Sequence, residues 1–551
     1  MTYSPNGMRA RNQQVIDEFR ANGGVLTGEF AGNMLLLTTT GRRSGREHTA
    51  PMMYKGRGET CFVIASNAGA KEHPDWYLNL LADPQVIVER RGERYEAIAR
   101  TATGEEREAM WAALLRTHPN FEEYQAMAGD RLIPLVLLEP RAQRVTTTPP
   151  ADDFALAAQS TPLARFVLDA IDEAGGRITF AQFMALALGH PEHGYYSRTD
   201  LAWGARGDYE TSPEVHPIFG YLWARQIEEC WQRLDHPPRF DLIEIGAGSG
   251  AFSVAMLTWL RARAPECFAA VRPVLLDGHP NRLAAQRAAI EDAGLHAEHA
   301  LLDDWLAAPE RVTGVVVSNE FFDALPVHLV TRRGDAPVAW SEWHVARDPH
   351  NTDALTFVED APSTPDLAAT FARLDLLPGD GARAEVGLAA VDAMRRIASK
   401  IERGYVLTID YGYESRELYA SWRREGTLMA FRAHSPVPNP LSEPGRTDIT
   451  YHVDLTSLAA AALESGDGWH AAPLTSQAEA LTVLGLPDAL RAAESRAHED
   501  ALRFLTDRRA AETLTDPTGL GRIRVLALAR HADLDGLACL RDVSAMYGPR
   551  A

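Results

Sequence analysis

Three polar residues that could take part in catalysis occur in the run Asn319-Glu-Phe-Phe-Asp-Ala-Leu-Pro326. The amide oxygen of Asn319 can accept a hydrogen bond from an acceptor N–H group and so aim the nitrogen lone pair at an electrophilic methyl carbon. An aromatic face, here Phe321 or Phe322, can stabilise the positive charge that develops on that nitrogen. We predict that Asn319, Glu320 and Asp323 are catalytic in methyl transfer to nitrogen. The alternative is structural: the phenylalanines would lie in the core and Asp323 would cap a helix.

Carboxylates are also needed if the methyl acceptor is a guanidinium, because that group resists deprotonation and requires anionic partners. By motif, the nearest candidates are Glu320, Asp323 and Glu385. A guanidinium acceptor is therefore compatible with this motif if the fold brings the carboxylates together.

Upstream, a buried strand is predicted at 240–245, followed by a glycine-rich turn and an apolar helix at 252–260. Glycines at such a turn let the backbone bend sharply and come within contact distance of a ligand. The next predicted strand ends at Asp277, whose carboxylate can accept hydrogen bonds from both hydroxyls of a ribose. An ordinary tight turn and a surface aspartate are the alternatives. The predicted cofactor-binding residues are Glu244, Gly246, Gly248, Gly250 and Asp277.

The elements that must position these residues fall into two patterns. Residues 1–140 contain short β-rich runs, which favour a small barrel; these runs are 34–40, 50–54, 60–66, 85–90, 95–100 and 133–138. Further on, buried strands at 240–245, 273–276, 315–318 and 405–410 alternate with helices, as in a parallel α/β sheet. Residues 141–161 lose the apolar periodicity and contain a Pro-Pro pair, as expected of a linker.

A basic loop in the first domain could bind an anion. The run Thr38-Thr-Thr-Gly-Arg-Arg-Ser-Gly-Arg46 brings three arginines to a strand end, with Lys55 and Lys71 further on. Guanidinium and backbone N–H groups can bind a phosphate, although such side chains often only face water. Segment 65–79 adds small residues, a cation and aromatic residues, which suits a flat ring lying on the backbone, unless the aromatic residues only close the barrel. The predicted contacts are Arg42, Arg43, Ser44, Arg46, Ser66, Lys71 and Trp76.

Composition limits the functional class. The 551 residues include 55 Lys and Arg against 75 Asp and Glu, a net charge of −20. Residues 1–140 contain 16 basic and 18 acidic side chains, which leaves −18 to the remainder. This charge disfavours binding to nucleic acid or anionic lipid. No run is long enough for a membrane span and no signal peptide is visible, so we expect a cytoplasmic protein. The four cysteines lack the spacing of a metal site, so we expect no metal.

Residues 162–530 resemble the MidA-like family of S-adenosylmethionine-dependent methyltransferases, whose mitochondrial members methylate an arginine on a respiratory complex I subunit and assist its assembly. The resemblance rests on 193–196, 207–214, 244–250, 319–326, 409–412, 426–432, 448–454 and 519–529. It implies S-adenosylmethionine as the cofactor and a Rossmann-like class I methyltransferase fold. It also implies that the cofactor pocket is bordered by Gly207, Asp208, Thr211, Ser212 and Pro213, with Asp277 on the ribose and Asp303 or Asp304 near the adenine.

This chain departs from the family pattern at two places. Ala247 and Ser249 stand where the family usually has Pro and Arg, and 522–524 reads Arg-Ile-Arg where Phe-Lys is more typical. Cofactor binding tolerates such changes, but they weaken the transfer of an arginine substrate from relatives.

Residues 35–140 resemble the deazaflavin-dependent nitroreductase family, a split β-barrel group that uses reduced coenzyme F-420 to reduce quinones or nitro compounds. The matching segments are 37–45, 51–54, 65–79, 82–84 and 133–134. The resemblance implies coenzyme F-420, with flavin mononucleotide as the less favoured alternative, and its anionic tail would account for the basic loop. Only Tyr124 remains of the tyrosines that some relatives carry near the pocket, while His118 and Phe121 occupy other positions, so a proton donor could be missing or replaced by His118.

The expected protein is thus an α/β multidomain fusion. It comprises a split β-barrel reductase domain at 1–140, a linker at 141–161, and a methyltransferase with inserted and C-terminal segments at 162–551. The expected partners are a protein substrate and a small-molecule electron acceptor such as a quinone. The alternative is an assembly or scaffold protein whose pockets hold cofactors without reacting.

Overall fold

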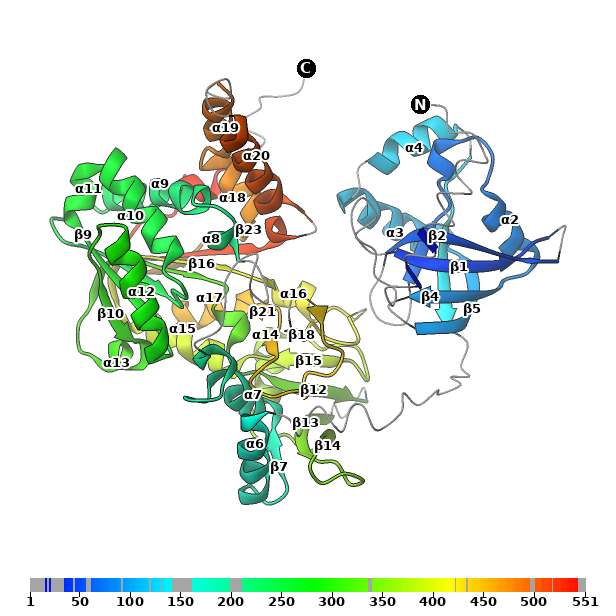
Figure 1. Cartoon of the computed structure of the whole chain (residues 1–551), viewed down its shortest axis with the longest axis horizontal. Helices are drawn as coiled ribbons and strands as arrows, with labels where there is room; N and C mark the ends of the chain where they lie inside the picture. The colour runs from blue at the N-terminus through cyan, green and yellow to red at the C-terminus, as the bar shows by residue number, and fades with distance from the viewer. Residues whose placement is uncertain are drawn as a thin grey trace. The chain divides into compact units, whose positions relative to one another are not determined.

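The computed structural model describes residues 15–16, 19–20, 34–42, 45–55, 61–90, 93–117, 120–129, 131–140, 161–198, 211–334, 339–421, 423–432, 435–495, 501–517 and 519–543. The chain divides into two compact units, Met1–Pro149 and Pro150–Ala551 (Figure 1). Residues 141–160, which make up almost all of the predicted linker, lie outside the described part.

The first unit contains a closed antiparallel barrel with the strand order β1-β2-β3-β6-β5-β4. Its strands are β1 (Met34–Thr40), β2 (Glu47–Lys55), β3 (Cys61–Ile64), β4 (Gln85–Arg90), β5 (Glu93–Thr101) and β6 (Leu135–Pro140). Side chains alternate along β1: Leu35 and Leu37 belong to the barrel core, whereas Leu36 packs with Phe19. The predicted barrel fold is confirmed.

Short helices accompany this barrel. They are η2 (Asn67–Gly69), α2 (Asp75–Ala82), α3 (Gly104–Thr117) and α4 (Asn120–Ala128). Helix α2 contacts β1, and η2 packs on α4 so closely that a Cβ at Gly69 would lie 2.9 Å from the Cβ of Met127.

The second unit is built on an eight-stranded sheet with the order β10-β9-β8-β11-β16-β24-β22, to which β23 adds by pairing with β24. Strands β8, β9, β10, β11 and β16 run parallel, and β24 is antiparallel to β16. The bounds are β8 (Phe240–Ile245), β9 (Val271–Asp277), β10 (Glu298–Leu301), β11 (Val312–Asn319), β16 (Ile401–Asp410), β22 (Trp469–Ala471), β23 (Thr475–Ser476) and β24 (Arg524–Arg530). The predicted parallel α/β sheet is confirmed.

Alternate side chains of the central strands enter two separate cores, because both sheet faces are covered. On β11, Val315 and Val317 pack in one core, and Val316 packs in the other. The first core includes residues of α9 (Ile218–Arg233), α10 (Ala251–Arg263), α11 (Pro265–Ala270), α12 (Pro280–Asp292), α18 (Gln477–Val483) and α20 (Ala501–Thr515). The second includes residues of α13 (Leu302–Ala307), α15 (Leu388–Lys400) and α17 (Leu455–Leu463).

A second sheet, with the order β14-β13-β12-β15, is inserted between β11 and β16, and β7 pairs with β13. Its strands are β7 (Arg177–Thr179), β12 (His328–Arg333), β13 (Ala339–Arg347), β14 (Leu355–Asp360) and β15 (Arg383–Val386). Helices α6 (Pro162–Glu173) and α7 (Phe180–Gly189) pack on this sheet, and α7 also contacts the short strand β20 (Asp448–Thr450). In Figure 1 this layer lies next to the main sheet.

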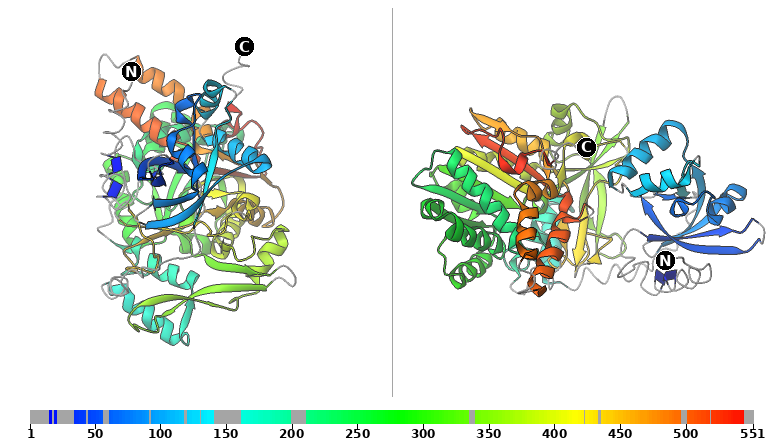
Figure 2. Two further views of the ribbon diagram at one scale, coloured as in Figure 1. Left: turned by 90° about the vertical axis from the view of Figure 1, so that its right-hand side faces the viewer. Right: turned by 90° about the horizontal axis from the view of Figure 1, so that it is seen from above.

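The remaining elements are short connections and small sheets. They are η3 (Tyr195–Ser197), α8 (Ser212–Val215), η5 (Phe322–Ala324), α14 (Asp366–Leu374), β17 (Gly412–Tyr413), α16 (Ser415–Leu418), β18 (Met429–Arg432), β19 (Ser435–Pro436), β20 (Asp448–Thr450), β21 (Val453–Asp454), α19 (Leu486–Glu494), η6 (Leu520–Arg522) and η7 (Ala538–Leu540). Helices α18, α19 and α20 contact one another and appear in orange tones in Figure 2.

Two features are absent from the described residues. Among them, no helix combines the length and apolarity that a bilayer crossing requires. The same residues contain no group of three or more His, Cys, Asp or Glu side chains arranged to hold a metal ion.

Candidate active site

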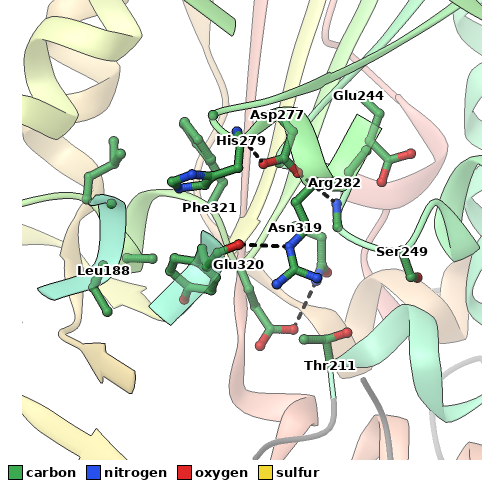
Figure 3. Close-up of a pocket in the computed structure, with 18 of the residues that line it drawn as sticks. Leu188, Thr211, Glu244, Ser249, Asp277, His279, Arg282, Asn319, Glu320 and Phe321 are labelled. Atoms are coloured by element: carbon green, nitrogen blue, oxygen red, sulfur yellow. Dashed lines mark hydrogen bonds between the residues drawn. The ribbon is translucent and has the colours of Figure 1, made fainter. Parts of the chain in front are cut away.

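The carboxyl ends of β8, β9 and β11 bring together six of the predicted residues: Glu244, Gly246, Gly248, Asp277, Asn319 and Glu320. Parallel strands end at the same sheet edge, so the loops that follow them surround one space. A cavity of about 280 Å³ lies there, lined by the glycine turn, by Asp277 to His279, by Asn319 to Phe321, and by residues of α7 (Figure 3). The sheet edge and α7 therefore enclose a common site.

The glycine turn has the backbone conformation that its sequence predicted. Gly246, Gly248 and Gly250 have φ values of 71°, 53° and 84°, in the left-handed region that favours glycine. A Cβ at Gly246 would lie 3.0 Å from Cδ2 of Phe321, so a larger residue would press against the Phe321 ring. Helix α10 begins at Ala251, directly after this turn.

Asp277 lies at the end of β9 and faces the turn. Its Oδ2 accepts hydrogen bonds from Gly248 N at 3.3 Å and Gln286 Nε2 at 3.1 Å, and its Oδ1 accepts one from His279 N at 3.3 Å. Burial raises the pKa of Asp277 to about 6, although these hydrogen bonds act in the opposite direction. The carboxylate lines the cavity, where a ribose could bind.

Glu244 is the second acidic residue at this end of the cavity. It is buried near the end of β8 and accepts a short hydrogen bond from Ser253 Oγ on α10. Burial raises the pKa of Glu244 to about 8. At neutral pH the side chain is therefore largely protonated and can donate a hydrogen bond.

Asn319 and Glu320 form a linked pair on the opposite wall. Asn319 Nδ2 donates to Glu320 Oε1 at 2.9 Å, and Ser212 N donates to the same oxygen at 3.4 Å. Among the described residues, the buried Oδ1 of Asn319 has no hydrogen-bond partner. Both residues line the cavity, so the unpartnered oxygen belongs to a side chain that borders the ligand space.

Glu320 is half-buried and lies beside three buried carboxylates, those of Asp323, Asp410 and Asp448. Burial raises its pKa to about 7, and Asp448 contributes in the same direction. The pKa of Asp410 rises to about 7, and that of Asp323 rises well above its usual range, chiefly through burial and then through the neighbouring carboxylates. Asp323 is buried behind the cavity wall and does not line it. These acids repel one another, so a cation near them would be stabilised.

The segment before α9 contributes Thr211, Ser212 and Pro213, of which Thr211 and Pro213 line the cavity. Ser212 Oγ donates to Gln477 Oε1 at 2.9 Å, which ties this segment to α18. Glu214 accepts a short hydrogen bond from Ser249 Oγ of the glycine turn. Two further predicted residues, Gly207 and Asp208, lie outside the described part of the chain.

Two acidic candidates lie elsewhere. Asp304 on α13 is exposed and does not line the cavity, while its neighbour Asp303 bonds to Arg396 at 3.3 Å.

Glu385 is buried, but its carboxylate accepts hydrogen bonds from Thr427 N at 2.8 Å and Leu428 N at 3.1 Å. It therefore holds the loop before β18 and does not reach the cavity.

The sequence did not indicate several residues that build the site. Arg282 on α12, labelled in Figure 3, donates to the backbone oxygens of Tyr196 and Arg198 at 3.0 and 3.1 Å and so ties the η3 segment to α12. Helix α7 adds a wall from Met184, Ala185, Leu188 and Gly189. These residues could not be predicted, because the apolar residues of a helix look the same in sequence whether they line a cavity or lie in the core.

In the first unit, the basic loop is anchored by Asn79 of α2. Arg42 N donates to Asn79 Oδ1 at 3.1 Å, and the Arg42 guanidinium bonds to Asp75 at 3.1 Å.

The other predicted contacts of this unit differ in exposure. Arg46 and Lys71 are exposed, and Trp76 and Ser66 are half-buried. Arg43 and Ser44, like His118, lie outside the described residues. Tyr124 is the tyrosine that remains of those found near the pocket in some relatives. Phe121 is buried against it in an edge-to-face contact.

Arg131 is a further residue of this unit that the sequence did not indicate. Its guanidinium donates to the backbone oxygens of Ala65, Ser66 and Ala70 at 3.1, 2.8 and 2.6 Å. It therefore fixes the loop that the sequence assigns to a flat ring.

Comparison with known proteins agrees with this geometry. The family model for S-adenosyl-L-methionine-dependent methyltransferases matches residues 222–473. The model for quinone reductases that depend on reduced coenzyme F-420 matches residues 11–140. The two family matches, together with the barrel of the first unit and the sheet and glycine turn of the second, thus define an S-adenosylmethionine-dependent methyltransferase joined to a domain of the quinone reductase family.

Individual relatives specify the family. A crystal structure of a COG1565 superfamily member from Burkholderia thailandensis, bound to S-adenosyl-homocysteine, is 31% identical, matches 70% of this chain and 95% of that one, and has a TM-score of 0.60. The mitochondrial protein arginine methyltransferase NDUFAF7 of Mus musculus is 28% identical over 54% of this chain and 69% of its own length. The Homo sapiens NDUFAF7 is 26% identical over 68% and 85%. The chain belongs to the COG1565 superfamily.

Proposed function

We propose that the second unit transfers a methyl group from S-adenosylmethionine to a guanidinium nitrogen of arginine in a protein partner. The observation that carries this proposal is the unpartnered amide oxygen of Asn319 on the cavity wall, in front of buried carboxylates. An amide oxygen accepts an N–H bond and orients the nitrogen lone pair, while carboxylates stabilise a cationic acceptor. The arginine methyltransferase names of the NDUFAF7 relatives support the same acceptor.

The cavity residues suit the cofactor. When bound, S-adenosylmethionine supplies an electrophilic methyl group on a sulfonium. Gly246 and Gly248 allow close approach of a ligand to the backbone, and Asp277 offers a carboxylate for the ribose. Arg282 holds the backbone of Tyr196, and both residues line the cavity.

The remaining residues act on the acceptor. Asn319 orients the nitrogen through its Oδ1, and Glu320 holds the Asn319 amide by accepting from Nδ2. A guanidinium nitrogen that gains a methyl group must lose a proton. Glu320, whose pKa is about 7, is suited to accept it.

Labelled methyl transfer to peptides whose only nucleophile is arginine, lysine or histidine tests this function with the full chain. We expect label on the arginine peptide and a rate loss of at least about 100-fold in Asn319→Ala, with affinity for S-adenosyl-homocysteine within about threefold of wild type. Asn351→Ala, in the loop between β13 and β14, is the control. Tight binding of S-adenosyl-homocysteine with no label on any peptide would favour the scaffold alternative.

We further propose that the first unit uses reduced coenzyme F-420 to reduce a quinone. The family match over residues 11–140 supports this activity. The exposed guanidinium groups of Arg42 and Arg46 can pair with the anionic part of that coenzyme. We also propose that the protein is cytoplasmic. The NDUFAF7 relatives are named as mitochondrial, so cell fractionation is needed to test this location.

Quinone-dependent oxidation of reduced coenzyme F-420 by the full chain tests this second activity. Arg42→Glu should weaken coenzyme binding about tenfold or more, whereas Arg94→Glu, on the exposed side of β5, should leave it unchanged. Binding of flavin mononucleotide in preference to F-420 would contradict the proposal.

A further inference from the structure

We propose that Asp410 is a positioning residue for methyl transfer, which holds the Asn319–Phe322 turn in its reactive shape through the backbone. The inference rests on the proposed function of this site. Asp410 ends β16, the strand that runs parallel to β11, so its side chain lies at the same sheet edge as Asn319.

The contacts of Asp410 concentrate on one turn. Its Oδ2 accepts hydrogen bonds from Phe321 N at 3.1 Å and from Phe322 N at 2.8 Å. The preceding residue, Ile409, accepts from Glu320 N at 2.8 Å through its backbone oxygen. The end of β16 thus accepts hydrogen bonds from three successive N–H groups of the turn that follows β11.

These bonds hold an unfavourable backbone conformation. Glu320 has a φ of 51°, in the left-handed region, which costs a residue with a side chain about 1 kcal/mol or more. Such a conformation persists only where surrounding contacts determine it, and the N–H groups on both sides of the Glu320 side chain are held by β16.

The conformation of Glu320 has a consequence for Asn319. It turns the Glu320 carboxylate back onto Asn319 Nδ2, which leaves the Oδ1 of Asn319 as the atom available to the acceptor. Asp410 itself does not line the cavity, so it acts on the reaction through this turn and not by touching the ligand.

Two substitutions distinguish the loss of the hydrogen-bond acceptor at position 410 from a change of residue that keeps this acceptor. Asp410→Ala removes the acceptor oxygen, whereas Asp410→Asn keeps an oxygen of similar reach. We expect kcat to fall at least about 30-fold in Asp410→Ala and to recover to within about fivefold of wild type in Asp410→Asn, with the KM for S-adenosylmethionine within about threefold in both.

A measurement without turnover reports on the turn directly. Hydrogen exchange of the peptide covering 319–326 in the cofactor-free protein should be faster in Asp410→Ala than in wild type or Asp410→Asn. The matched control is Asp454→Ala. This buried aspartate accepts hydrogen bonds from Ser457 in the first turn of α17 and from Ser415 at the start of α16, so its loss should leave exchange at 319–326 unchanged.

The outcomes decide separate questions. Wild-type exchange and kcat in Asp410→Ala overturn the positioning role, and so does an Asp410→Asn variant as impaired as Asp410→Ala. A wild-type chain without methyl transfer contradicts the proposed function, and the exchange comparison then still tests the role of Asp410. If Asp410→Ala does not fold, Asp410→Ser, whose hydroxyl is too short to reach the same N–H groups, replaces it with the same expectations.

Discussion

At the residue scale, Glu320 links the orientation of the amide to the charge of the pocket. Its pKa of about 7 means that it changes charge near neutral pH. Only the ionised carboxylate favours a cationic acceptor, so kcat/KM for an arginine substrate should rise as the pH increases from about 6 to about 8 and then level off. Initial rates across this range should show the rise, and Glu320→Gln should lack it. A profile that falls over the same interval would contradict the assigned role.

Glu244 predicts an effect on stability with a defined sign. Its pKa of about 8 in the folded protein exceeds the ordinary value of 4.5, so the folded state binds its proton more tightly than the unfolded state. Its contribution to stability is therefore present at low pH and is lost as the pH rises through about 8. The melting temperature should fall between about pH 6 and pH 9 in wild type and fall less in Glu244→Gln.

Glu298 provides the contrast for this measurement. Arg272 lowers the pKa of Glu298 through hydrogen bonds at 2.7 Å. Its contribution is present above its ordinary pKa, so Glu298→Gln should shift the melting temperature equally at both pH values. Equal pH slopes in wild type and Glu244→Gln would show that Glu244 is not the group responsible.

At the element scale, the glycine turn depends on how closely α10 packs on α9. A Cβ at Gly220 of α9 would lie 2.4 Å from the Cβ of Ala255 and 3.2 Å from the backbone oxygen of Phe252. Gly220→Ala must push the helices apart, which should cost about 1–3 kcal/mol and weaken binding of S-adenosyl-homocysteine. Thermal unfolding and calorimetry measure both effects. Gln232→Ala, on an exposed position of the same helix, should change neither.

At the scale of the whole molecule, each hydrophobic core that the described residues form draws its members from one unit. The clusters around Leu35, Phe19 and Phe121 belong to the first unit, and those around Val315 and Val316 belong to the second. A chain that begins at Pro150 should therefore fold and bind S-adenosyl-homocysteine within about twofold of the full chain. Calorimetry on both chains checks this. Loss of binding in the shorter chain would show that the first unit is needed for the second to form its site.

Local signals account for the parts of the fold and site that could be predicted. The six strand runs of the barrel and the buried strands of the parallel sheet follow from alternating or continuous apolar residues, which act over a few positions. Gly246, Gly248 and Gly250 were recognisable because a left-handed backbone favours glycine wherever it occurs. Asp304, in contrast, was assigned by motif position, and the structure places it on the surface.

The sequence by itself determined the two fold classes, the glycine turn and the polar motif at 319–323, because each depends on residues that are neighbours in the chain. Only the tertiary structure decided which distant groups complete the site. Tyr196 bonds to Asp448 across 252 positions, and Asp410 holds a turn 88 positions away. Such contacts arise where strand ends and an inserted layer meet at one sheet edge, and no local pattern of residue types records that meeting.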